Sequence, residues 1–171
     1  MSKELVPKQS ATDEADPVAV ARIIALRRLE AAPRTRHELH ITLSDKGVPA
    51  EAITEVLDRF CEVGLIDDAA FATAWVTSRH RGRGLARRVL ALELQRKGVA
   101  PEIIDQALEL IHHDDERERA VALVHNKLPR MRHLESEVII RRLVGQLSRK
   151  GYSPGLAYSV VREALESVDV S

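Results

Sequence analysis

The sequence is poor in cysteine and in aromatic residues. Its 171 residues include one cysteine, Cys61, and only five aromatic side chains. A single cysteine excludes a disulfide framework within the chain and fits a reducing cytoplasm. No apolar run approaches the roughly 20 residues of a membrane span, and the N-terminus lacks the apolar segment of a secretory signal. We therefore expect a cytoplasmic protein that does not contact membranes.

Catalytic and cofactor-binding signatures are also missing. The sequence contains no Walker A motif, no nucleophile elbow and no zinc signature. His112 and His113, followed by three acids, invite a metal-site interpretation, but adjacent helical side chains point about 100° apart and cannot share one ion. The alternative is a solvated junction at which Asp115, with Glu118, caps a helix. We predict no enzymatic activity and no cofactor.

What the sequence does contain is an internal repeat. Lys-Gly pairs occur three times, about fifty residues apart, and end at Gly47, Gly98 and Gly151. Leucines stand eight and four residues before each glycine, at Leu39, Leu43, Leu90, Leu94, Leu143 and Leu147. The positions 5, 6, 9, 10 and 13 residues after each glycine are apolar in every copy and form one helical stripe. Cys61 follows the first stripe and is predicted to be a small buried residue.

Each Lys-Gly pair predicts the end of a helix rather than a phosphate-binding loop. Glycine adopts the left-handed conformation just past a helix, and the preceding lysine faces the negative end of the helix dipole, which is worth about 0.3–1 kcal/mol. These lysines are Lys46, Lys97 and Lys150. A phosphate loop would have several glycines after a strand, and no strand pattern precedes any copy. The prolines that follow, Pro49, Pro101 and Pro154, suit the first turn of the next helix.

A further helix opens each unit. Its predicted N-caps are Asp16, Asp67-Asp68 and Asp115, and Thr35 with Glu38 forms a capping box for the middle helix of the first unit. The predicted inward stripes are Ala70, Phe71, Ala74 and Trp75 in the second unit and Ala120, Val121 and Val124 in the third. The sequence thus predicts an all-α protein of three tandem three-helix repeats. Their ranges are 16–66, 67–114 and 115–168, after a disordered lead at 1–15.

Charge is segregated along the chain although the net charge is zero. The third helix of each unit is acidic, whereas no acid occurs from 69 to 92 or from 138 to 162. The arginines of these two segments that we take as candidate partner-binding residues are Arg79, Arg81, Arg83, Arg87, Arg88, Arg141, Arg142 and Arg149. The segregation becomes a surface patch if the repeats stack in register; otherwise it only keeps surface helices soluble.

The densest basic stretch is residues 79–84, with the sequence RHRGRG. Its two glycines predict a flexible connector between helices, and its arginines suit bidentate contacts with phosphate or carboxylate. A solvated loop without a binding role is the alternative, and we favour the binding role. A base-stacking platform is not expected, because the five aromatic residues are too few and mostly face inward.

Three short patterns connect the chain with a known family. Gly-Leu/Ile-Ile-Asp-Asp-x-x-Phe-Ala matches residues 64–72, Arg-Ser/Thr-x-x-Glu-Leu matches residues 34–39, and Glu-Leu-x-x-Lys-Gly matches residues 93–98. With these motifs the chain resembles the bacterial RecX family of recombination regulators. The resemblance runs from about residue 17 to 167 and is strongest in the first two units.

The resemblance implies a curved, elongated monomer that binds the RecA protein and the RecA–single-stranded DNA filament along the filament groove. It also implies restraint of the ATPase, strand-exchange and coprotease activities of RecA, in homologous recombination, DNA repair and the SOS response. It assigns no individual contact residues, so the candidate arginines rest on charge and exposure.

The alternative function is a helix-turn-helix DNA-binding regulator, because two helices around a tight turn also describe that motif. The predicted third helices, however, present acids such as Glu51, Glu55 and Asp58, which DNA would repel. Weak nonspecific DNA contact from the arginine-rich segments stays open.

Overall fold

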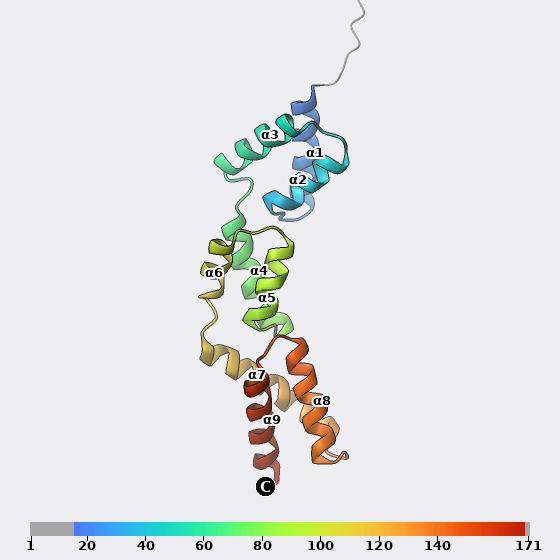
Figure 1. The fold of residues 1–171 in the computed structure, drawn as a ribbon, viewed down its shortest axis with the longest axis vertical. Helices are drawn as coiled ribbons and strands as arrows, with labels where there is room; N and C mark the ends of the chain where they lie inside the picture. The colour runs from blue at the N-terminus through green and yellow to red at the C-terminus, as the bar shows by residue number, and fades with distance from the viewer. Residues whose placement is uncertain (1–15, 170–171) are drawn as a thin grey trace, which may run out of the picture.

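The computed structural model describes residues 16–169, and in that range the chain is helical and contains no strand (Figure 1). The predicted disordered lead, 1–15, lies outside the described residues. The helices are α1 (Pro17–Ala31), α2 (Arg36–Asp45), α3 (Ala50–Glu62), α4 (Asp68–Arg83), α5 (Arg87–Arg96), α6 (Pro101–Leu108), α7 (His113–Lys127), the 3₁₀ helix η1 (Leu128–Met131), α8 (Ser136–Arg149) and α9 (Pro154–Asp169). The predicted all-α fold of three tandem three-helix repeats is confirmed.

The middle helices end at the repeated Lys-Gly pairs. Gly47, Gly98 and Gly151 have φ angles of 75°, 71° and 96°, a left-handed conformation that costs glycine nothing and other residues about 1–2 kcal/mol. The lysine before each glycine is the C-cap of α2, α5 or α8. The predicted helix ends are therefore confirmed. Of the three prolines, Pro101 and Pro154 begin α6 and α9, whereas Pro49 is the N-cap of α3.

The first two units start as their N-caps predict. The Asp16 side chain accepts a hydrogen bond from the Val18 amide, and that of Asp67 accepts one from the Ala70 amide. The third unit differs, because α7 begins at His113 and His112 is its N-cap. Asp115 lies in the first turn, where its carboxylate accepts the His112 amide at 3.0 Å. Its predicted N-cap role is wrong, since an acid can satisfy a free amide equally well from inside the first turn.

Each unit encloses its own hydrophobic cluster between three helices. Helices α1, α2 and α3 pack together, as do α4, α5 and α6, and α9 packs on both α7 and α8. All six repeated leucines are at most 2% exposed. The apolar stripe after each glycine is buried except at Ile103 and Leu156, which are partly buried against their clusters. We propose 16–66, 67–114 and 115–168 as the boundaries of these units.

The first helix of each unit buries one residue pair, four positions apart. The pairs are Ala21 with Ala25, Ala72 with Val76, and Ala120 with Val124. The stripe predicted for the second unit is therefore correct only in part: Ala70 and Ala74 are exposed, whereas Phe71 and Trp75 are half-buried and pack against the cluster of that unit. Small residues at the buried pair let α4 approach α6 closely, and the bulky aromatic residues pack at the edge of the cluster, where they also line a hollow at the first junction.

Cys61 is exposed, so its predicted burial is wrong. It follows Phe60, the last buried residue of α3, and the next helix position turns outward. The units stack end to end, with the first at the top of Figure 1 and the third at the bottom, which gives an elongated molecule. Each unit contacts only its neighbours, as in other repeat proteins.

Glycines at equivalent positions of the repeat have different surroundings, because the units stack on one another. A methyl group added at Gly98 would overlap the His37 side chain of the first unit, Cβ included, whereas one added at Gly47 meets nothing within 4 Å. We expect Gly47→Ala to lower the free energy of unfolding by about 1–2 kcal/mol, for backbone strain alone. Gly98→Ala should cost about 1–3 kcal/mol more, for steric overlap. Urea denaturation of the two variants checks this, and equal losses would contradict the stacking.

Candidate partner-binding surface and unit junctions

The arginine-rich segment 79–84 is helical and not a flexible connector. Helix α4 continues through Arg83 and ends at Gly84, which has a φ of 62°. The Gly84 amide donates to the His80 carbonyl and the Leu85 amide to the Arg79 carbonyl, which closes the last turn. The interpretation of two glycines as a loop fails because Gly82 is tolerated inside the helix and only Gly84 ends it.

Three candidate arginines of this helix end differ in their surroundings. Arg79 lies over the indole ring of Trp75, 4.1 Å from its centroid. The guanidinium of Arg83 is 3.9 Å from a carboxylate oxygen of Glu93, a weak contact for an arginine that is 58% exposed. Arg81 is exposed, and its backbone carbonyl accepts a hydrogen bond from Arg119 of the third unit.

Arg87 is a structural residue rather than a free one. Its Nη1 donates to the Ile111 carbonyl at 2.9 Å, and its backbone amide donates to the Glu116 carboxylate at 3.0 Å. The same helix position in the first unit is Arg36, whose amide donates to Asp68 at 2.9 Å and whose guanidinium pairs with Asp58. The guanidinium–Asp58 contact raises the Arg36 pKa. An arginine at this position is thus part of the repeat.

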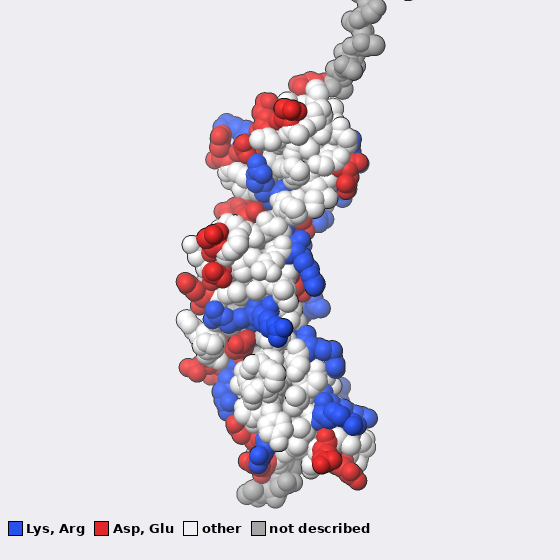
Figure 2. All heavy atoms as spheres, viewed as in Figure 1, with Lys and Arg blue, Asp and Glu red and all other residues white. Residues whose placement is uncertain are grey.

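The remaining candidates are available for a partner. Arg88, Arg141, Arg142 and Arg149 are exposed and form no hydrogen bond or ion pair with the rest of the described chain. Figure 2 shows lysines and arginines gathered along the right-hand edge of the second and third units and across their junction, while acids lie mainly along the left-hand edge of the first two. On this face the cations are therefore concentrated on the second and third units, whereas acids occur on all three units.

The first junction is held by polar contacts at the start of α2. The Thr35 hydroxyl, which is fully buried, donates to the Lys97 carbonyl at 2.6 Å. The Lys97 ammonium pairs with the Glu38 carboxylate at 2.6 Å and lies 4.5 Å from the Trp75 ring centroid. Burial raises the pKa of Glu38, but the hydrogen bonds from Lys97 and the Thr35 amide outweigh it, and the net pKa is lowered.

The second junction repeats this arrangement with different residues. The Ala86 amide donates to the Lys150 carbonyl at 2.9 Å, and the Lys150 ammonium donates to the Arg83 carbonyl at 2.5 Å. The buried Tyr152 hydroxyl donates to the Gly84 carbonyl at 3.0 Å. Burial, together with the Glu116 charge, raises the pKa of Tyr152 to about 12. Burial also lowers the pKa of Lys150, as do nearby cations.

These contacts change the interpretation of the three repeated lysines. Lys46 is exposed and makes only the predicted helix-end contacts. Lys97 and Lys150 reach into the preceding unit, so a capping energy of about 0.3–1 kcal/mol describes Lys46 alone. The sequence missed this role because the partners, Glu38 and the Arg83 carbonyl, are about sixty residues away.

The described residues hold no group of three His, Cys, Asp or Glu side chains placed as metal ligands. His112 and His113 are exposed at the second junction, and His112 caps α7. None of the helices in the described range has the length and apolar character to cross a bilayer.

Comparison with known proteins identifies the architecture. The model of the first three-helix domain of RecX matches residues 21–60, and that of the second matches residues 67–108. The regulatory protein RecX of Streptomyces coelicolor is 54% identical over 151 residues, which cover 88% of this chain and 80% of that protein. The chain belongs to the RecX family.

Other relatives agree with this assignment. The regulatory protein RecX of Thermobifida fusca is 50% identical over 164 residues, covering 96% of this chain and 88% of that protein. The crystal structure of RecX from Lactobacillus salivarius shares the fold with a TM-score of 0.77 at 24% identity, over 92% of this chain and 99% of that one. Both matched domains lie within the first two units, whose junction contains the Arg34–Leu39 and Glu93–Gly98 motifs.

Replacing Lys97 tests the first junction. Lys97→Met leaves the half-buried Glu38 carboxylate without its ionic partner. We therefore expect the free energy of unfolding to fall by about 1–3 kcal/mol. Lys46→Met, the matched control, should change it by at most about 0.5 kcal/mol. Urea denaturation at neutral pH measures both, and equal effects would assign Lys97 a capping role only.

The loss of the Lys97–Glu38 pair should also change how stability depends on pH. Since folding lowers the Glu38 pKa, the contribution of this carboxylate is complete above the ordinary glutamate pKa of about 4.3 and is lost as the pH falls through the lowered value. Lys97→Met should therefore lose less stability than the parent between neutral and acid pH.

Proposed function

We propose that this protein binds the RecA–single-stranded DNA filament and restrains the ATPase, strand-exchange and coprotease activities of RecA. It acts as a cytoplasmic monomer in homologous recombination, DNA repair and the SOS response, with no catalytic activity or cofactor of its own. The observation that carries the proposal is the likeness to proteins named regulatory protein RecX over most of both chains.

The shape and charge of the molecule support binding to a filament. A filament presents the same subunit at regular intervals, and a stacked repeat protein presents an extended surface that can follow several of them. The exposed arginines Arg88, Arg141 and Arg142 lie on two successive units and have no internal partner. Exposed guanidinium groups without an internal partner can form bidentate contacts with DNA phosphates or with carboxylates of a protein partner.

A DNA-reading helix-turn-helix is the weaker function for this chain. Helix α3 exposes Glu51 and Glu55, and α6 exposes Glu102 and Asp105. A recognition helix enters the major groove between two rows of phosphates, where exposed carboxylates are repelled. Weak nonspecific contact of the arginines with the DNA backbone remains part of the proposed binding to the filament.

We expect the purified protein to lower the single-stranded-DNA-dependent ATP hydrolysis of RecA and to hydrolyse no ATP itself. The physical reason is that a ligand bound to the filament shifts it away from the states that turn over. A coupled ATPase assay with increasing protein checks this. Unchanged hydrolysis at several-fold excess over filament sites would contradict the proposed function.

The arginine surface is tested by replacing Arg88, Arg141 and Arg142 together with Gln. Because these side chains have no internal partner, stability should change by at most about 0.5 kcal/mol per site. Binding to the RecA–DNA filament should weaken about tenfold and depend less on salt, as expected for the loss of a few exposed charge contacts. Fluorescence anisotropy at several salt concentrations measures both quantities.

The matched control replaces Arg22, Arg27 and Arg28, which are exposed on α1 of the first unit, with Gln. It removes the same charge from outside the candidate surface and should bind almost as the parent does. Equal weakening in both triple variants would show that net charge, and not this surface, governs binding. Arg79 and Arg87 are left intact because they contact Trp75 and Ile111.

A further inference from the structure

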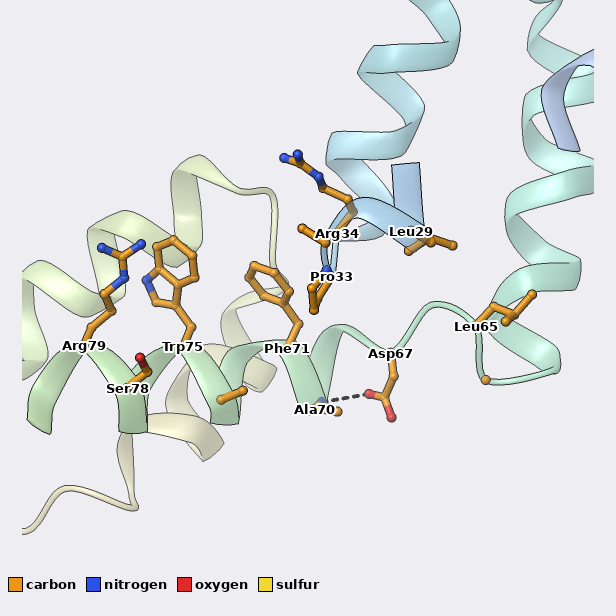
Figure 3. A pocket seen from close by; sticks show the side chains of 13 residues that line it. Leu29, Pro33, Arg34, Leu65, Asp67, Ala70, Phe71, Trp75, Ser78 and Arg79 are labelled. Carbon is orange, nitrogen blue, oxygen red and sulfur yellow. Dashed lines mark hydrogen bonds between the residues drawn. The ribbon is translucent and has the colours of Figure 1, made fainter. Parts of the chain in front are cut away.

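An apolar groove lies at the first junction, between the end of α1, the turn before α4 and the exposed side of α4 (Figure 3). It has a volume of about 550 Å³. Its apolar lining comes from Leu29, Ala32, Pro33, Leu65, Ala70, Phe71, Ala74 and Trp75. A groove of this size accepts a small number of apolar side chains or a small ligand.

The wall of the groove is a ladder of side chains one helical turn apart on α4. The rings of Phe71 and Trp75 are stacked, with centroids 5.6 Å apart and an angle of 18° between their planes. Figure 3 shows Trp75 between Phe71 on one side and Arg79 on the other. The Trp75 ring nitrogen donates to Glu93 at 2.8 Å, which fixes the indole in this position. The wall is therefore preorganised.

The charged residues that line the groove are Arg34, Arg79 and Asp67. Arg34 forms no hydrogen bond or ion pair with the rest of the described chain, and Arg79 contacts only the Trp75 ring. Glu93 is bonded to Trp75, and the Asp67 carboxylate accepts the Ala70 amide at 2.8 Å. Arg34 and Arg79 give the groove an excess of positive charge, and they lie away from Asp67 (Figure 3).

Building the repeat does not require this groove. Aligned on the buried pairs, Phe71, Trp75 and Arg79 correspond to Arg119, Leu123 and Lys127 at the second junction. There Arg119 bonds to the carbonyl of Arg81, and the hollow is lined by polar groups, including His80, Asp115 and Glu118. The two junctions share their hydrogen bonds but not the apolar surface, so that surface serves something other than stacking.

We propose that this groove binds an extended peptide segment of a protein partner, with one or two apolar side chains flanked by carboxylates. The apolar side chains enter between Pro33, Leu65 and the Phe71–Trp75 ladder. The carboxylates pair with Arg34 and Arg79, because these guanidinium groups line the groove and form no ion pair within the described chain.

A single-stranded nucleic acid suits the groove less well. Base stacking needs an open ring face, but Trp75 already has Phe71 on one side and Arg79 on the other. The peptide proposal is independent of the proposed inhibition of RecA, since it concerns a different surface from that of Arg88, Arg141 and Arg142.

The test uses the sole tryptophan of the chain as its reporter, because Trp75 lies in the groove. The probe is the synthetic hexapeptide Glu-Asp-Phe-Leu-Asp-Glu, titrated into the full-length protein while tryptophan fluorescence is followed. We expect saturable binding that weakens as salt is raised. The neutral peptide Gln-Asn-Phe-Leu-Asn-Gln and the anchorless Glu-Asp-Gly-Ser-Asp-Glu should each bind at least about tenfold more weakly.

Two double variants of α4 locate the binding. Ala70→Glu with Ala74→Glu places carboxylates inside the groove, whereas Ala69→Glu with Thr73→Glu adds the same charge to exposed positions of the same helix that do not line it. The first pair should abolish the fluorescence change and the second should preserve it, with equal thermal unfolding of both. Arg34→Gln with Arg79→Gln should weaken binding and reduce its dependence on salt.

Three outcomes would overturn the proposal: equal binding of the neutral peptide, equal loss in both double variants, or tighter binding of oligo(dT) than of the acidic peptide at the same groove. The outcome is separable from the proposed function. A groove that binds no peptide leaves RecA inhibition to be measured by ATP hydrolysis, and normal peptide binding without RecA inhibition would contradict only the latter.

Discussion

The stacking of the three units depends on which groups donate hydrogen bonds to the last carbonyls of each middle helix. A helix leaves its last carbonyl groups without partners inside the helix, and burying them unpaired is costly. The carbonyls of Lys97 and Lys150 are each paired with a donor from the preceding unit, the Thr35 hydroxyl and the Ala86 amide. One hydrogen bond thus ends a helix and fixes the position of a unit. The junction cations and the close approach at Gly98 follow from that placement.

The local features of the fold could be predicted from the sequence because they depend on neighbours in the chain. The leucine spacing, the left-handed glycines and the N-caps at Asp16, Thr35 and Asp67 involve residues only a few positions apart. The N-cap of α7 was misplaced because Asp115 can bond to the same amide from within the first turn. The local sequence does not distinguish these two positions.

The candidate site was less predictable because its residues act across junctions. Arg87 bonds to Ile111 and Glu116, more than twenty residues away in the sequence. Trp75 lies at the edge of the core and at the first junction, because α4 buries Ala72 and Val76 instead. An amphipathic pattern identifies the apolar residues of a helix but not which neighbour each one faces. The equivalence of Arg36 and Arg87 in the repeat was the one signal in the sequence that an arginine there has a structural role.

The first helix of the first unit differs from its two counterparts in one contact. In the second and third units an acid in the first helix, Asp68 or Glu116, accepts the amide at the start of the preceding middle helix. In the first unit the corresponding position is Pro17, which has no carboxylate, and a methyl group added at Gly47 would meet no described residue within 4 Å. Pro17 thus lacks the carboxylate with which Asp68 and Glu116 accept an amide of the unit before them.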